Sequence, residues 1–143
     1  YRQPMFAQFE AWLHEQLEAG QALSSSDLTD YYYKLNQDYY GPAVTVHELE
    51  KYKCYSVPHF YYNFYVYQYA TSYCAAFSVA HKILEEGTPA VERYKKFLSG
   101  GCSMAPVELL KIAGVNLETP APIQDALNAF GEIIKEMETL VED

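Results

Sequence analysis

Apolar residues recur at three- and four-residue steps along most of this chain, and this spacing constrains the fold more than any other feature of the sequence. In the first segment the repeat consists of Met5, Phe6, Phe9, Leu13 and Leu17. A proline suits the first turn of a helix, and a glycine often ends one. Pro4 and Gly20 occupy these two places. The segment therefore predicts a helix that begins near Pro4 and stops at Gly20.

The same signals delimit further helices downstream. Residues 24–27 offer N-cap side chains and an acidic first turn for a second helix, which Gly41 and Pro42 end. Thr88 is a cap candidate for a later helix that has Pro89 in its first turn. That helix covers residues 89–98, and the remaining expected helices cover residues 44–56, 58–86, 106–113 and about 120–141.

The stretch after Pro58 is the hardest to assign, because Phe60, Tyr62, Phe64 and Val66 alternate as they would in a strand. No other segment resembles a partner strand, however, and an unpaired strand is not stable. The three- and four-residue spacing continues as far as residue 84. We therefore expect one helix over 58–86, and an all-α bundle of about six to seven helices.

The length of the chain fits one compact domain over residues 1–143. Half of these residues are apolar, which is enough to bury a core. No apolar run approaches the roughly 20 residues of a membrane span, and nothing resembles a signal peptide. Because a helical pattern begins directly after Tyr1, we expect a piece of a longer chain.

The charge balance argues against nucleic acid and anionic membranes as partners. The chain has 10 basic and 19 acidic residues, a net charge of −9, and no cluster of Lys and Arg to neutralise phosphate. Cys54, Cys74 and Cys102 form an odd set without a CxxC pair. This set predicts free thiols in a reducing compartment.

Two sequence pairs resemble the first half of a zinc motif, but neither completes it. The dipeptide HE occurs at 14–15 and 47–48, and the HExxH motif needs a second His four residues after the first. Glu18 and Lys51 stand at those positions. A His and a Glu also lie four residues apart at 81 and 85, but such pairs are common by chance. We expect no metal site in this chain.

The chain contains 15 tyrosines, several of them in the aromatic run after Pro58. On a helix, His59 and Tyr62 lie three residues apart near its start, with Tyr65 and Tyr69 on or beside the same face. Two neutral donors that converge on one external point can stabilise an oxyanion. From spacing alone, packing of these rings in a core is the favoured interpretation.

Five separate segments resemble the C-terminal part of the oligoendopeptidase F family. They are YRQPMFAQFE at the start, YYGPAV at 39–44, PHFYYNFYVYQYAT from residue 58, ILEEGTPAVERYKKFLSGG at 83–101 and ELLKIAGVNLETPAPIQDALNAF at 108–130. The similarity runs over nearly the whole chain. This family stands with thimet oligopeptidase among cytosolic zinc peptidases, which cut short peptides inside a deep, largely helical channel.

The resemblance implies a role for individual residues. The family's zinc ligands, an HExxH helix and a downstream Glu, precede the segment that matches Tyr1, so this chain would supply the wall that faces the metal. Placing VPHFYY beside the relatives' proline-tyrosine-x-x-tyrosine arrangement implies Tyr62 as the donor to the oxyanion and His59 as its substrate-contacting companion. Tyr55, Tyr65 and Tyr69 are further candidates for substrate binding.

Three hypotheses remain open at the level of sequence. In the first, the chain is the C-terminal part of a cytoplasmic oligopeptidase. It is then inactive alone, its partners are short peptides and the missing N-terminal part of the same chain, and zinc belongs to the full-length enzyme. In the second, it is a non-catalytic helical module that binds peptides or proteins. In the third, it is a structural acidic domain whose tyrosines fill a core.

Overall fold

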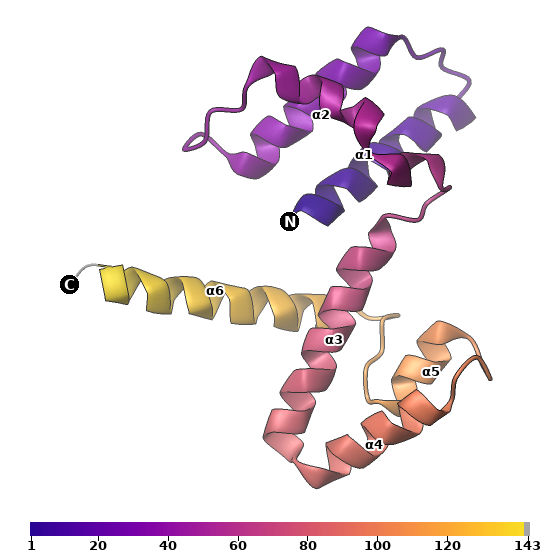
Figure 1. The fold of residues 1–143 in the computed structure, drawn as a ribbon, viewed down its shortest axis with the longest axis vertical. Helices are drawn as coiled ribbons and strands as arrows, with labels where there is room; N and C mark the ends of the chain where they lie inside the picture. The colour runs from indigo at the N-terminus through magenta and orange to yellow at the C-terminus, as the bar shows by residue number, and fades with distance from the viewer. Residues whose placement is uncertain (142–143) are drawn as a thin grey trace. The chain divides into compact units, whose positions relative to one another are not determined.

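The computed structural model describes residues 1–141, within two compact units, Tyr1–Ala70 and Thr71–Asp143. Six α-helices and two 3₁₀ segments make up the regular structure of the described residues, which include no strand. Figure 1 shows their order along the chain. The all-α prediction is confirmed, whereas the expected single domain stays a prediction.

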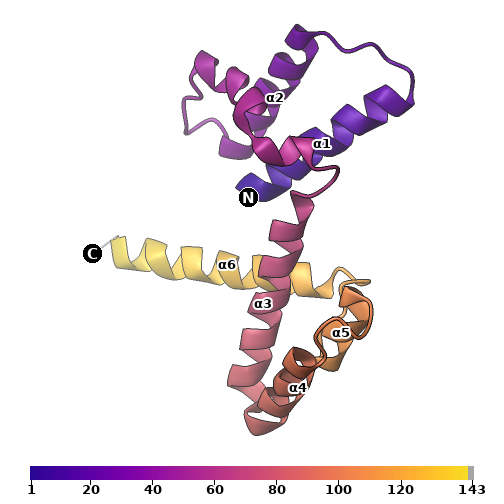
Figure 2. The ribbon, with the colours of Figure 1, turned by 45° about the vertical axis from the view of Figure 1, so that its right-hand side comes forward.

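The first unit is built on two helices, α1 (Arg2–Glu18) and α2 (Ser25–Tyr40), which lie side by side in both Figure 1 and Figure 2. A 3₁₀ segment, η1 (Glu48–Ser56), packs against α2. Aromatic rings fill the space between α1 and α2, where Trp12 stacks on Tyr31 with 4.0 Å between ring centroids. The buried core consists of Met5, Phe6, Phe9, Tyr32, Leu35, Cys54, Val57 and Val66.

A reciprocal pair of hydrogen bonds fixes the start of α2. The Asp27 amide donates to the Ser24 hydroxyl at 3.3 Å, and the Ser24 amide donates to the Asp27 carboxylate at 2.8 Å. These bonds satisfy two backbone donors that a helix start leaves open, which is the purpose of a capping box. The cap expected within residues 24–27 is therefore confirmed at Ser24.

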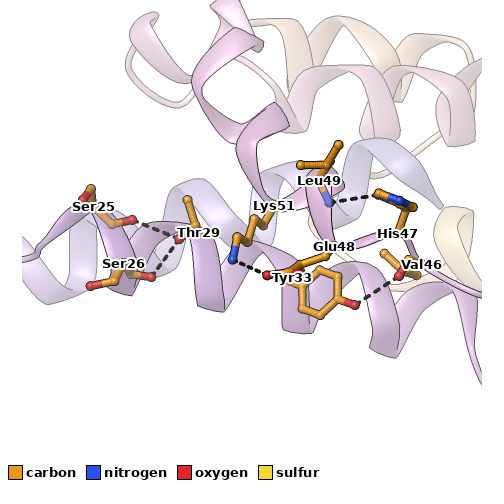
Figure 3. Close-up of polar contacts among 9 residues, drawn as sticks. All are labelled: Ser25, Ser26, Thr29, Tyr33, Val46, His47, Glu48, Leu49 and Lys51. Atoms are coloured by element: carbon orange, nitrogen blue, oxygen red, sulfur yellow. Dashed lines mark hydrogen bonds and ion pairs between the residues drawn. The ribbon is translucent and has the colours of Figure 1, made fainter.

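The segment between α2 and the aromatic run is a 3₁₀ helix, shorter than the helix expected over 44–56. Figure 3 shows its anchors: the Tyr33 hydroxyl donates to the Val46 carbonyl at 3.0 Å, and the Leu49 amide donates to His47 Nδ1 at 3.2 Å. The second bond caps the start of η1, so the HE dipeptide at 47–48 marks a helix start.

The expected helix over 58–86 is wrong before Tyr67. A short 3₁₀ turn, η2 (Pro58–Tyr61), comes first, and α3 (Tyr67–Glu86) begins only after a bend. Within the bend Asn63 has φ 49° and Phe64 has φ 58°, a left-handed conformation that a right-handed helix excludes. The Phe64 amide donates to the Glu10 carboxylate at 2.7 Å instead of to a carbonyl of its own segment. A contact from α1 thus replaces the local hydrogen bond that a continuous helix requires.

The second unit contains the rest of α3 and three further helices, α4 (Thr88–Ser99), α5 (Pro106–Ile112) and α6 (Ala121–Val141). Its buried core consists of Ala75, Val79, Ala113 and Val115. Helices α4 and α5 pack together, and a Cβ on Gly100 would overlap the Leu109 side chain. The N-cap of α4 is Gly87 rather than the expected Thr88, which is the first residue of the helix.

Helix α6 carries a long apolar stripe that remains exposed. Pro122 is its buried residue, while Met137 is 58% exposed. The exposed apolar residues of α6 are Ile123, Leu127, Phe130, Ile133, Ile134, Met137, Leu140 and Val141. Among residues 1–141, none of the helices has the length and apolar character needed to cross a membrane.

Candidate functional site

Four of the five predicted site residues come together on one surface of the first unit. His59 lies in η2, Tyr62 directly after it, Tyr65 in the bend and Tyr69 in the first turn of α3. The bend at residues 62–65, and not the predicted helical spacing, therefore brings these four side chains together. We refer to His59, Tyr62, Tyr65 and Tyr69 as the His59 cluster.

His59 is the centre of this cluster. Its ring stacks on Tyr65, with 5.8 Å between centroids and 13° between planes. Tyr62 and Tyr69 meet its ring edge-on, at centroid distances of 6.3 Å and 5.4 Å. Such aromatic contacts restrict the rotamers of all four rings, so the polar tips of the side chains are presented as a set.

A hydrogen bond connects the imidazole of the cluster to one of its phenols. His59 Nε2 lies 3.2 Å from the Tyr69 hydroxyl. A hydrogen bond with Tyr65, together with partial burial, raises the pKa of Tyr69 above its ordinary value of 10.0. Tyr69 therefore stays a neutral hydroxyl over the physiological pH range, able to donate as well as to accept.

Tyr55, the fifth predicted residue, makes different contacts. Its hydroxyl donates to the Ser25 carbonyl at 3.0 Å, and burial raises the pKa of this phenol. The Tyr61 hydroxyl in turn donates to the Tyr55 carbonyl at 3.3 Å. Tyr55 thus ties η1 to the start of α2, and the structure does not bring it into the His59 cluster.

The exposure of the cluster separates it from core packing. Tyr62 is 59% exposed, Tyr65 40% and Tyr69 42%, whereas the buried core of this unit lies around Phe6, Phe9 and Tyr32. Rings gathered to fill a core would be buried like these three. An exposed set of hydroxyl and imidazole groups has the chemistry of a surface that binds a ligand rich in hydrogen-bonding groups.

The comparisons with known proteins assign the family. The model of peptidase family M3 matches residues 1–129. The chain belongs to peptidase family M3. The resemblance to oligoendopeptidase F drawn from the sequence is confirmed.

Relatives of this M3 chain are named oligopeptidases. It is 45% identical over 141 residues to oligopeptidase PepF of Bacillus subtilis, an alignment that covers 99% of this chain and 21% of that protein. It is 39% identical to the plasmid-encoded oligoendopeptidase F of Lactococcus lactis subsp. cremoris, which it covers to 24%. The crystal structure of oligoendopeptidase-F from Enterococcus faecium matches 99% of this chain with a TM-score of 0.94 and 44% identity. The chain covers 27% of that structure.

The donor set of this M3 chain does not fit the zinc ion that the family implies. No group of three or more His, Cys, Asp or Glu side chains among residues 1–141 is placed to hold a metal. His14 stacks on Phe64 at 4.1 Å, and His47 caps η1. His81 Nε2 lies 3.1 Å from Glu85 Oε1, one turn along α3, where both side chains are exposed.

A hollow of about 470 Å³ lies in the second unit of the M3 chain, and none of the predicted site residues lines it. Ser78, His81 and Glu85 of α3 line one side, and Asp125 and Asn128 of α6 line the other. Its lining carries both charges, but no three of its His, Asp and Glu side chains are placed to hold a metal. Ser78 Oγ has no hydrogen-bond partner among the described residues, so no base activates it as a nucleophile. We assign it no catalytic part.

Sequence reasoning did not single out Glu10, which the structure connects to the site. Glu10 is fully buried, and its carboxylate accepts the Phe64 amide between Tyr62 and Tyr65. A signal was present in the sequence, since Glu10 follows Phe9 on the apolar side of α1 where a charged side chain is unexpected. Its hydrogen-bond partner, Phe64, lies 54 residues further along the chain, and no local sequence pattern indicates a contact over that separation.

Proposed function

We propose that residues 1–143 form the substrate-facing wall of a zinc-dependent oligopeptidase that hydrolyses short peptides. The observation that carries this proposal is the His59 cluster, an exposed set of three phenols around one imidazole in a chain of family M3. A peptide backbone presents carbonyl and amide groups at regular intervals, and hydroxyl groups can hydrogen-bond to both.

Within this wall, the Tyr62 hydroxyl donates a hydrogen bond to the oxygen of the scissile carbonyl as negative charge develops there. A donor that is neutral in the ground state and fixed in place stabilises the oxyanion more than the carbonyl, and this difference accelerates the reaction. His59 stacks on Tyr65 and meets Tyr62 edge-on, and it contacts substrate through its ring. Tyr65 and Tyr69 bind the flanking backbone.

The zinc ion of the family would be held by residues outside this sequence, because the described residues do not fit it. The chain spans 21% to 27% of the relatives named above, so a catalytic centre built with another part of the polypeptide is compatible with those lengths. We accordingly propose that residues 1–143 are inactive alone, and that the rest of the peptidase is their partner. Three free thiols in the described chain fit a cytoplasmic location.

The role of Tyr62 is tested by Tyr62→Phe in the full-length protein. Loss of one oxyanion donor costs about 2.7–4 kcal/mol, so we expect turnover of a fluorogenic peptide to fall roughly 100- to 1,000-fold. Zinc content, measured by atomic emission, should stay at the wild-type value. Tyr40→Phe is the matched control, since Tyr40 is 51% exposed at the end of α2 and outside the cluster. Turnover of Tyr62→Phe within threefold of wild type would exclude this role.

The location of the metal centre is tested with the 143-residue polypeptide alone. We expect it to cleave no peptide and to bind zinc only weakly in equilibrium dialysis, because its imidazoles are dispersed and individually paired. Stoichiometric, tightly bound zinc in this polypeptide would contradict the proposal. Peptide binding by the full-length protein without cleavage would favour a non-catalytic binding module instead.

A further inference from the structure

Two residues of α1 contact Phe64, which lies in the bend of the first unit. The Phe64 amide donates to Glu10 Oε1 at 2.7 Å, and the Phe64 ring stacks on His14, with 4.1 Å between centroids and 30° between planes. Glu10 and His14 lie four residues apart and therefore on one face of α1. We call Glu10 and His14 the α1 clamp.

The residues that the clamp holds are in a conformation that needs support. Asn63 and Phe64 both have left-handed backbone angles, and Phe64 is a bulky side chain for which this region is disfavoured. A residue held in such a region is strained and persists where the surrounding structure enforces it. The hydrogen bond to Glu10 and the stack on His14 are contacts that enforce it.

Burial of Glu10 is not explained by stability alone. A carboxylate that is fully buried loses its hydration, and apolar side chains of similar size are often as stabilising or better at such positions. Glu10 Oε2 is buried and has no protein hydrogen-bond partner among the described residues. The hydrogen bond that the carboxylate accepts is therefore the one from the Phe64 amide to Oε1. That contact ends on the bend between Tyr62 and Tyr65.

We propose that Glu10 and His14 are positioning residues for the His59 cluster, fixing the bend at Asn63 and Phe64 so that Tyr65 stacks on the His59 ring and Tyr62 meets it edge-on. This inference rests on the proposed function, because it assigns the clamp to the same site. The clamp touches no substrate; it acts through the backbone of Phe64. Without it, the bend is released toward right-handed angles and the Tyr62 hydroxyl moves away from the reacting oxygen.

The activity test compares Glu10→Ala and Glu10→Gln in the full-length protein. Misplacement of a catalytic group by about 1 Å can cost on the order of 100-fold, so we expect Glu10→Ala to lower kcat roughly 10- to 100-fold while KM changes less than about threefold. Glu10→Gln keeps an amide oxygen for the Phe64 amide and should recover most of the loss. Met5→Ala is the control, because Met5 is a buried residue of α1 outside the clamp. It should lower the denaturant midpoint and leave kcat unchanged.

A second set of variants separates positioning from general stability. Glu10→Ala combined with Tyr62→Phe should have the kcat of Tyr62→Phe alone within about threefold, because a donor that is absent cannot be misplaced. Full additivity of the two losses would overturn the proposal, as would a wild-type kcat for folded Glu10→Ala.

Amide hydrogen exchange tests the clamp without reference to activity. We expect exchange of the Phe64 amide to become at least about tenfold faster in Glu10→Ala, while amides in the middle of α2 keep their wild-type rates. Unchanged exchange at Phe64 would overturn the clamp whatever the kinetics show. Faster exchange and lower kcat, with Tyr62→Phe itself near wild type, would retain the clamp and refute the oxyanion role proposed for Tyr62.

Discussion

At the scale of single residues, burial changes the acid–base behaviour of Tyr32. The Tyr32 ring packs against Phe6 and Phe9 in the core of the first unit, and Tyr32 is 2% exposed. Burial disfavours the phenolate and raises the pKa of Tyr32 above its ordinary value of 10.0. The folded chain therefore holds the Tyr32 proton more tightly than the unfolded chain does.

This difference predicts a loss of stability at high pH that depends on Tyr32. The stabilising contribution is fully present below the unfolded pKa near 10 and is lost as pH rises through the higher folded value, by up to about 1.4 kcal/mol per pH unit. We expect Tyr32→Phe to gain stability relative to wild type between pH 9 and pH 11.5 in urea denaturation. Leu35→Ala, a core variant that cannot ionise, should lose the same amount relative to wild type at both pH values.

At the scale of the secondary-structure elements, the capping box makes the start of α2 sensitive to one hydroxyl. Replacing a serine N-cap by alanine costs about 1 kcal/mol, and by glycine only a few tenths. We expect Ser24→Ala to lower the free energy of unfolding of the first unit by about 1 kcal/mol, and Ser24→Gly by less. Ser25→Ala leaves the Ser24 hydroxyl and Asp27 in place and should be nearly neutral. Equal effects of the alanine variants at 24 and 25 would contradict the observed cap.

Helices with local start and stop signals were predictable, and the site bend was not. The end of α1, both ends of α2 and the start of α5 follow from Gly20, Ser24, Gly41 and Pro106, whose effects act within a few residues. The bend after Pro58 depends on Glu10, 54 residues from Phe64 along the chain. No periodicity within 58–86 contains that contact, so the aromatic spacing indicated a continuous helix.

The candidate site was predictable in its members more than in its geometry. His59, Tyr62, Tyr65 and Tyr69 do lie together, but on a 3₁₀ turn, a bend and the first turn of a helix. Spacing alone favoured burial of these rings, whereas Tyr62 is 59% exposed. Tyr55 was grouped with them through the resemblance, and its hydroxyl is instead used by the Ser25 carbonyl.

At the scale of the whole molecule, the exposed stripe of α6 bears on association. Large exposed apolar patches are usually interaction surfaces or sites of self-association. We expect the 143-residue polypeptide to associate reversibly despite its net charge of −9. Sodium sulfate should strengthen this association, because it favours apolar burial and screens the charge.

Sedimentation velocity over a range of concentrations measures this association. The double variant Ile134→Gln and Met137→Gln removes apolar surface without changing the charge and should shift the polypeptide toward monomer. Leu98→Gln, at a residue of α4 that is 59% exposed, is the control and should leave the association unchanged. A wild-type polypeptide that remains monomeric at millimolar concentration would contradict the prediction.

The stack of Trp12 on Tyr31 in the first unit has a practical consequence. Trp12 is the single tryptophan of the sequence, so all indole fluorescence of the 143-residue polypeptide originates beside the α1–α2 core. A ring held against another at 4.0 Å experiences a different environment once the unit unfolds and water reaches it. Emission excited near 295 nm therefore follows the first unit alone, while circular dichroism follows the helices of both. Any gap between the two melting curves would measure directly how far one unit can lose its order before the other does.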